Sequence, residues 1–187
     1  MDAREVTLKD GRRAAVRPIE IGDAPDLMAL QHAVHGAGEG VVRDVSELAQ
    51  TVEDLESEIR AWTEGHHRSG RGVHLVGVID RRAVGEASAK RMRPARLRHV
   101  ARIGIEVHPE AHGLGLGRAL MEGLIAWARA SGEVSRLDLS VFARNTRALR
   151  LYESLGFVRE GERRRFIRDP DGTEHNDVIM GLLLGGR

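Results

Sequence analysis

The stretch HPEAHGLGLGRAL, residues 108–120, joins an extended apolar run, IGIEV, to an amphipathic helix that we predict over residues 118–130. The first amides of a helix have no intrahelical partner and carry the positive end of the helix dipole, so this position suits an anion. Gly113, Gly115 and Gly117 remove side chains that would hold a phosphate away from those amides. Arg118 adds a cation that can pair with phosphate. The stretch therefore predicts a pyrophosphate site at a strand-to-helix turn.

Two nucleotide-binding motifs compete for this loop, and both match it poorly. A Rossmann loop needs Gly-x-Gly-x-x-Gly, whereas the glycines here are spaced Gly-x-Gly-x-Gly. The acid expected about 20 residues further on would be Glu133, which lies at a predicted helix end rather than a strand end. A Walker loop needs Gly-Lys followed by Ser or Thr, and this chain has Gly-Arg-Ala. A turn that binds no ligand is the remaining alternative.

A second helix is predicted over NTRALRLYESLG, and the sequence marks both of its ends. Asn145 suits the N-cap, and Gly156 suits the position that follows the helix. The apolar stripe of this helix consists of Ala148, Leu149, Tyr152 and Leu155.

Outward from these two segments, hydrophobic periodicity predicts the element order β-α-α-β-β-β-α-β-α-β-β. Three short strands over residues 73–80, 83–92 and 99–107 make an antiparallel meander. A helix ending at Gly65 precedes them, and two strands joined at a DPDG turn close the chain. We therefore predict a mixed α/β fold with a mostly antiparallel central sheet flanked by helices, built as a single domain over residues 1–187.

Composition excludes several classes of protein. The 29 Lys+Arg and 28 Asp+Glu leave a net charge of +1, which argues against a nucleic-acid partner. The absence of cysteine excludes disulfides, thiolate metal sites and a cysteine nucleophile. Without an apolar run of signal-peptide or membrane-spanning length, we expect a cytoplasmic protein with no membrane partner. His108 and His112 suggest a metal site, but Pro109 interrupts the helix that would align them, so we expect no metal.

Taken together, the two blocks resemble the GCN5-related N-acetyltransferase (GNAT) family, which includes bacterial acetyltransferases of small amines and of ribosomal proteins. The family motif Gln/Arg-x-x-Gly-x-Gly/Ala corresponds to HGLGLG, with His112 at the position of the usual Gln or Arg. The block N-x-x-A-x-x-L-Y-x-x-x-G-F is present in full as NTRALRLYESLGF, and DVIM resembles the family's C-terminal strands. The resemblance covers about half of the chain, residues 102–184.

This resemblance implies that acetyl-CoA binds in a wedge where the strand IGIEV parts from its neighbour SVF. Backbone groups of residues 105–107 would hold the pantetheine arm, and amides of residues 112–118 would hold the pyrophosphate. If the His112 side chain took part, coenzyme affinity would depend on pH. The residues so implied in coenzyme binding are Ile105, Glu106, Val107, His112, Gly113, Leu114, Gly115, Leu116, Gly117, Arg118, Asn145, Ala148 and Tyr152.

Acetyl transfer from a thioester to an amine needs a group that removes a proton from the amine and a group that protonates the leaving sulfur. By resemblance Tyr152 is the acid, although packing in the helix stripe is its alternative role. Glu106 is a candidate base because it alternates with the apolar residues of its strand, and its alternative is a surface position. Glu86 is a weaker candidate. Ser140 stands where many family members that acetylate N-terminal amines carry a glutamate.

We therefore predict an N-acetyltransferase that moves an acetyl group from acetyl-CoA directly to the primary amine of a small molecule, either a polyamine or an amino-acid-like compound. Two alternatives remain: acetylation of a protein N-terminus or lysine, and a non-catalytic CoA- or nucleotide-binding regulatory module. Acids within residues 47–64 could line the acceptor entrance and favour a cation. The C-terminal strand pair offers an edge through which a homodimer could form.

Overall fold

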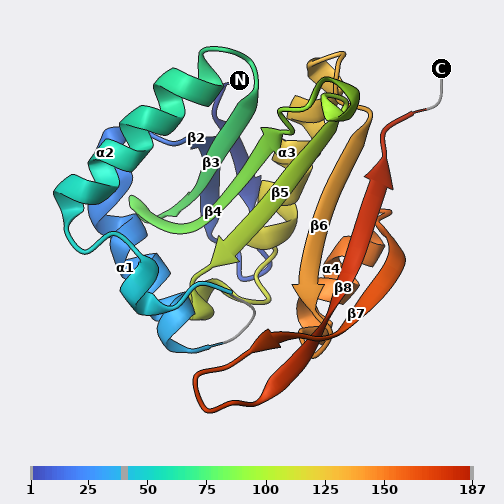
Figure 1. Cartoon of the computed structure of the whole chain (residues 1–187). Coiled ribbons are helices and arrows are strands. Elements are labelled where there is room, and N and C mark those ends of the chain that lie inside the picture. Colours follow the sequence, from blue (N-terminus) through green and yellow to red (C-terminus); the bar gives the residue numbers. More distant parts are fainter. Residues whose placement is uncertain (1, 39–41, 186–187) are drawn as a thin grey trace.

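The computed structural model describes residues 2–38 and 42–185 and contains an eight-stranded sheet (Figure 1). The strand order is β1-β2-β3-β4-β5-β6-β8-β7, and every neighbouring pair is antiparallel except β5 and β6. The strands are β1 (Arg4–Thr7), β2 (Arg13–Pro18), β3 (Gly72–Ile79), β4 (Arg82–Arg91), β5 (Val100–Val107), β6 (Arg136–Phe142), β7 (Val158–Arg168) and β8 (Glu174–Leu183). The helices are α1 (Ala24–Gly36), α2 (Val52–Trp62), α3 (Leu116–Ala130) and α4 (Thr146–Ser154).

The predicted mixed α/β fold with a mostly antiparallel sheet is confirmed, and three local details differ. The first strand, β1, pairs with β2 over only four residues and was not predicted, because it carries little apolar alternation of its own. Helix α3 begins at Leu116, two residues before the predicted start. Gly65 does not end the second helix, because a π-helical turn over Thr63–His67 continues from α2.

Helices cover both faces of the sheet and define two cores (Figure 1). Helices α1 and α2 pack on one face, where Leu27, Leu30, Leu55 and Ile59 meet Val76 of β3. Helices α3 and α4 pack on the other face, and their buried residues include Leu116, Leu120, Leu124 and Leu149. Among the described residues no helix combines the length and apolarity needed to cross a bilayer.

Strands β5 and β6 part from one another part of the way along the sheet. They pair in parallel only over residues 100–102 of β5 and 136–138 of β6. Strand β4, in contrast, pairs with β5 as far as Val107. The edge of β5 that faces β6 is therefore unpaired beyond residue 102. The predicted wedge between IGIEV and SVF is present.

Candidate active site

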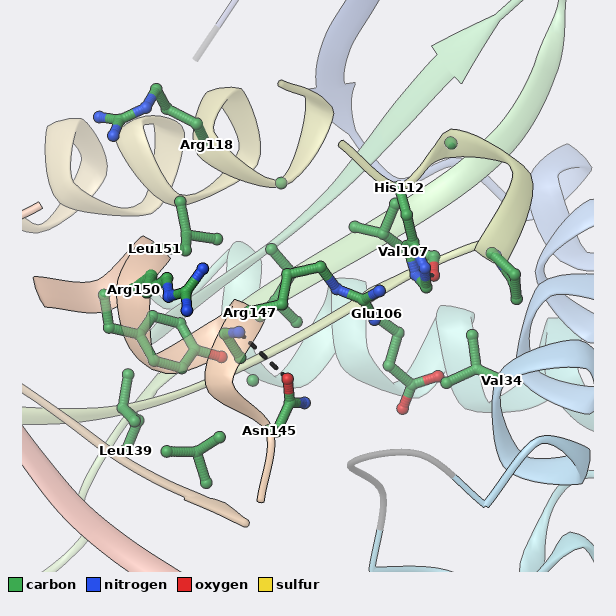
Figure 2. Close-up of a pocket in the computed structure, with 18 of the residues that line it drawn as sticks. Val34, Glu106, Val107, His112, Arg118, Leu139, Asn145, Arg147, Arg150 and Leu151 are labelled. Atoms are coloured by element: carbon green, nitrogen blue, oxygen red, sulfur yellow. Dashed lines mark hydrogen bonds between the residues drawn. The ribbon is translucent and has the colours of Figure 1, made fainter. Parts of the chain in front are cut away.

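A cavity of about 760 Å³ lies where β5 and β6 part, between α3 and α4 (Figure 2). Its walls come from six parts of the chain: the β1–β2 turn, the end of α1, residues 42–43, β5 with the glycine loop and the start of α3, β6, and α4. All but two of the residues implied in coenzyme binding line this cavity; Leu114 and Leu116 do not. The side chain of Leu116 is instead buried beneath the sheet, where it fills the space above Gly77 and Gly85.

The backbone of β5 supplies hydrogen-bonding groups to this cavity. The amide of Met92 donates to the Val100 carbonyl at 3.0 Å, and the amide of His108 donates to the Val84 carbonyl at 2.9 Å. Because backbone groups alternate in direction along an antiparallel pair, these two bonds direct the Glu106 backbone toward β4. The amides and carbonyls of Ile105 and Val107 therefore face the opening between β5 and β6.

The glycine loop adopts a conformation that requires glycine at two positions. Gly113 has φ +77°, and Gly115, the N-cap of α3, has φ +100° and ψ −6°. A Cβ at either position would meet no atom within 4 Å, so both face open space. Gly117 differs, because its φ is not positive and a Cβ there would lie 3.5 Å from Leu151. Gly113, Gly115 and Gly117 all line the cavity, at the end where α3 begins.

His112, the irregular member of the motif, is already engaged by the protein. Its ring Nε2 donates to the Val107 carbonyl at 2.7 Å, and its amide donates to the Pro109 carbonyl at 3.1 Å. These bonds hold the turn between β5 and α3. The His112 amide is therefore engaged within this turn, and the prediction of phosphate contacts is narrowed to the amides of residues 113–118.

Several cations around the cavity were not anticipated from the sequence. Lys9 enters from the β1–β2 turn, and Arg147 and Arg150 enter from α4. Figure 2 shows Arg147 reaching across the cavity toward β5. Arg118 lies at the rim, where it donates to the Ser154 hydroxyl at 2.6 Å and so bridges α3 to α4. The spacing of Arg147 and Arg150 on the predicted helix could have revealed them, whereas Lys9 left no local signal.

Tyr152 lies on the buried side of α4 and also lines the cavity. Burial raises the pKa of its hydroxyl to about 12. The ring packs at a tilt against Phe157, with centroids 5.8 Å apart. The hydroxyl has no hydrogen-bond partner among the described residues, and its raised pKa keeps it protonated at neutral pH. Asn145 caps α4 as predicted, because its side-chain oxygen accepts from the Ala148 amide at 3.1 Å (Figure 2).

Glu106 does not occupy the surface position that was its alternative. Its carboxylate points toward Val34 of α1 (Figure 2), and its side chain is only 20% exposed. Oε1 lies 3.1 Å from Nε2 of His35, while Oε2 is shielded from solvent with no partner in the described part of the chain. Burial and the charge of Glu86 raise the pKa of Glu106, and His35 and Arg43 oppose this shift.

A second cavity, of about 280 Å³, lies under α1 and α2 and shares part of its lining with the first. Residues common to both cavities are Arg43, Gly104, Ile105 and Glu106. Other residues that line the second cavity include Glu58, Trp62, His74 and Glu86. Among the described residues, Glu106 is therefore the only acidic residue that lines both cavities.

Glu86 is a buried carboxylate in this second cavity, and it is held by two side chains. Nε2 of His74 lies 2.7 Å from Oε2, and the Gln31 amide donates to Oε1 at 2.9 Å. Burial alone would raise the pKa of Glu86, but these contacts outweigh burial and keep its pKa below the ordinary value. Glu86 is thus ionised, and both of its oxygens already have hydrogen-bond partners. It is therefore poorly suited to be the base, the role for which the sequence made it a weaker candidate.

Among the described residues no group of three or more His, Asp or Glu is arranged to hold a metal ion. His108 instead uses Nδ1 to accept from the Glu110 amide at 3.3 Å. The basic run on β7 is neutralised locally, since Arg163 pairs with Asp177 and Arg168 pairs with Glu174.

Comparison with known proteins agrees with this geometry. The family model described as the acetyltransferase (GNAT) family matches residues 41–157. The [ribosomal protein bS18]-alanine N-acetyltransferase of Escherichia coli K12 is 35% identical over 123 residues, which cover 66% of this chain and 81% of the relative. The crystal structure of a GNAT-family acetyltransferase from Streptococcus pneumoniae superposes with a TM-score of 0.82 at 27% identity and covers 91% of this chain and 99% of that one.

The fold is also that of a Salmonella typhimurium structure solved with its cofactor acetyl-CoA. That match has a TM-score of 0.79 at 22% identity and covers 93% of this chain and 95% of that one.

Proposed function

The chain belongs to the acetyltransferase (GNAT) family, and from that premise we propose that it transfers the acetyl group of acetyl-CoA to the primary amine of a small cationic acceptor. Acetyl-CoA supplies an activated acetyl thioester when it is bound. The observation that carries the proposal is the position of Glu106, a residue that lines two adjoining cavities of different character. The larger cavity has the features of a coenzyme site, and the smaller has those of an acceptor site.

Residues of the larger cavity are suited to each part of the coenzyme. The outward-facing backbone groups of Ile105 and Val107 would bind the amide-containing arm, because amides of that arm need both donors and acceptors. The amides of residues 113–118 would bind the pyrophosphate, where the open space beside Gly113 and Gly115 leaves room for it. Lys9 and Arg147, which also line this cavity, would add positive charge that attracts the phosphates.

Proton transfer in the proposed reaction falls to Glu106 and Tyr152. A primary amine is an ammonium ion at neutral pH and becomes a nucleophile only after it loses a proton. Oε2 of Glu106 is the accepting atom that we propose, because it is buried and unpartnered among the residues that the structure describes. The Tyr152 hydroxyl retains its proton below about pH 12 and would donate it within the larger cavity.

Charge in the smaller cavity supports a cationic acceptor. Glu86 and Glu58 bring two carboxylates besides Glu106, and Trp62 adds an aromatic wall. A volume of about 280 Å³ lies near the lower end of the range for ligand sites, so it favours a small amine.

A second candidate acceptor is the N-terminal amine of a protein. It is favoured by the 35% identity to the Escherichia coli enzyme that acts on ribosomal protein bS18 alanine. Ser140, which lines the larger cavity in place of a carboxylate, weakens this alternative.

The test is an acetyl-CoA consumption assay across diamines, polyamines, amino acids and peptides that begin with alanine. We expect the highest kcat/KM for a small cation with a primary amine. A peptide that exceeds every small amine would replace the proposed acceptor by a protein N-terminus. Acetyl-CoA binding without turnover for any acceptor would support the non-catalytic module instead.

The matched variant for this test is Glu106→Gln, which preserves size and removes the base. We expect kcat/KM to fall by about 100-fold or more, as for the loss of a general base. Acetyl-CoA affinity, measured by calorimetry, should stay close to the wild-type value. If Glu106→Gln turned over at the wild-type rate, Glu106 would be removed from the mechanism.

A further inference from the structure

Two side chains that contact or face Glu106 have no role in the proton transfer proposed so far. His35 comes from the last turn of α1 and is almost fully buried, with a side-chain exposure of 2%. Glu86 comes from β4, where it is the direct cross-strand partner of Glu106. The backbone hydrogen bonds on either side make this a hydrogen-bonded pair, for which Cα atoms lie about 5.5 Å apart and side chains project from the same face.

The contacts of His35 define which of its ring nitrogens carries a proton. Nδ1 lies 2.8 Å from the carbonyl oxygen of Arg43, and a carbonyl can only accept, so Nδ1 is the donor. In a neutral ring Nε2 then carries a lone pair, and it faces Oε1 of Glu106 at 3.1 Å. A lone pair against a carboxylate oxygen would be repulsive. The contact therefore requires one proton between these two atoms, held by either partner.

We propose that His35 and Glu106 accept the acceptor's proton as one unit, and that Glu86 is the fixed negative charge that stabilises this unit after proton uptake. The proposal rests on the function assigned above, in which Glu106 is the base. Glu106 is the catalytic residue, because it faces the acceptor space, and His35 and Glu86 are positioning residues that act through it.

The proton count of the step balances. Before transfer the pair holds one proton between Oε1 and Nε2 and has no net charge. The ammonium gives one proton to Oε2 of Glu106, and its N–H bond pair becomes the lone pair of a neutral amine. The shared proton then resides on Nε2, so the pair ends as a neutral carboxylic acid and an imidazolium with a charge of +1. No other reactant is required.

Glu86 stands where this new positive charge needs a counter-charge. Its carboxylate is ionised and held by His74 and Gln31, so it cannot itself take the proton without breaking those bonds. Its charge raises the pKa of Glu106, and Arg43 of the loop after α1 lowers it. Arg147 of α4 brings further positive charge to the neighbouring cavity, while the residues of β6 that line it, Leu139, Ser140 and Val141, are all uncharged.

The test compares pH profiles of kcat/KM for Glu86→Gln and His35→Gln with that of the wild type. Glu86→Gln removes the fixed charge and keeps the side-chain shape, so we expect a lower plateau and an acid limb at lower pH. His35→Gln keeps a donor toward Oε1 but cannot take up a proton. Because His35 lowers the pKa of Glu106, we expect this variant to move the acid limb to higher pH, opposite to Glu86→Gln, with a loss of about tenfold or more at the plateau. Acetyl-CoA affinity should be unchanged in both variants.

The matched control is Asp23→Asn, which removes another buried, ion-paired carboxylate, the partner of Arg17. Asp23 lines neither cavity. We expect Asp23→Asn to lower thermal stability without moving the acid limb. If Glu86→Gln and His35→Gln lowered the plateau but left the limb in place, as Asp23→Asn would, both residues would be merely structural and the proposal would be overturned.

A second measurement does not depend on catalysis. In coenzyme-free protein, nitrogen NMR should show His35 protonated at Nδ1, and carbon NMR should show the Glu106 carboxyl titrating at lower pH in Glu86→Gln. A neutral ring protonated at Nε2 would overturn the shared-proton pair. If Glu106→Gln lost activity while the pH profiles of Glu86→Gln and His35→Gln were unshifted, only this inference would be overturned. Full activity in Glu106→Gln would overturn the proposed function.

Discussion

Replacing Gly115 by alanine tests whether the left-handed N-cap of α3 shapes the phosphate-binding loop. Gly115 has φ +100°, and its Cβ would meet no atom within 4 Å, so the entire cost of the change lies in the backbone. Placing a non-glycine residue in the left-handed conformation lowers the free energy of unfolding by about 1–2 kcal/mol. For a domain of this size each kcal/mol lowers Tm by about 2–4 °C, so Gly115→Ala should melt about 2–8 °C below the wild type.

The same substitution should weaken coenzyme binding. If the loop relieves the strain by rotating one amide away from the phosphate, the loss of one hydrogen bond to a charged group costs about 1.5–3 kcal/mol. Calorimetry should then show acetyl-CoA affinity lower by about tenfold to about 100-fold.

Gly117→Ala is the matched control within the same loop. Gly117 has no positive φ, and a Cβ there makes only ordinary contacts at 3.5–3.8 Å with Leu151, Val107 and Ile105. Because alanine favours helix by up to about 1 kcal/mol over glycine, Tm should stay the same or rise. The strain argument would be refuted if Gly115→Ala had the same Tm as the wild type. It would also be refuted if Gly117→Ala had a Tm as low as that of Gly115→Ala.

Substitutions at Tyr152, Glu106 and Gly77, the last with Gly161 as its control, give further expected outcomes. Tyr152→Phe should lose turnover by about 100-fold or more while calorimetry shows unchanged acetyl-CoA binding; retained turnover would leave the hydroxyl a packing role only. The pKa of Glu106 is raised in the folded state. Between its ordinary pKa and this raised pKa, the folded protein holds a proton that the unfolded chain has lost. The free energy of unfolding therefore falls as the pH rises through this range. Melting curves should therefore show Glu106→Gln at least as stable as the wild type at neutral pH, and a large loss of Tm there would contradict the sign. Gly77→Ala would place a Cβ 2.7 Å from buried Leu116 and should cost about 1–3 kcal/mol, whereas Gly161→Ala, with open space around it, should not change Tm.

Much of the local structure around the candidate coenzyme site could be predicted because its determinants are local in the chain. The glycine loop, the Asn145 cap and the Gly156 terminator each follow from the conformational needs of one turn. The order of strands and helices follows from periodicities of two and of 3.6 residues, which are also local. Strand β1 was not predicted, since four residues with little alternation carry too weak a pattern.

The candidate base and its surroundings could not be derived in the same way. Sequence alternation placed Glu106 on the opposite side of β5 from Ile105, but it did not distinguish an exposed face from one covered by α1. His35 is 71 residues from Glu106, and Gln31 is 55 residues from Glu86, so no spacing rule connects them.

The sequence by itself thus determined the family, the fold class and the place of the glycine loop between β5 and α3, because backbone conformation and amphipathic pattern depend on neighbours in the chain. Only the tertiary structure decided that β5 and β6 part beyond residue 102, that Glu106 faces two cavities, and that His35 and Glu86 surround it. The burial of a carboxylate and the charges around it depend on residues that are distant in the sequence and that only folding brings together. This environment sets the pKa of the carboxylate.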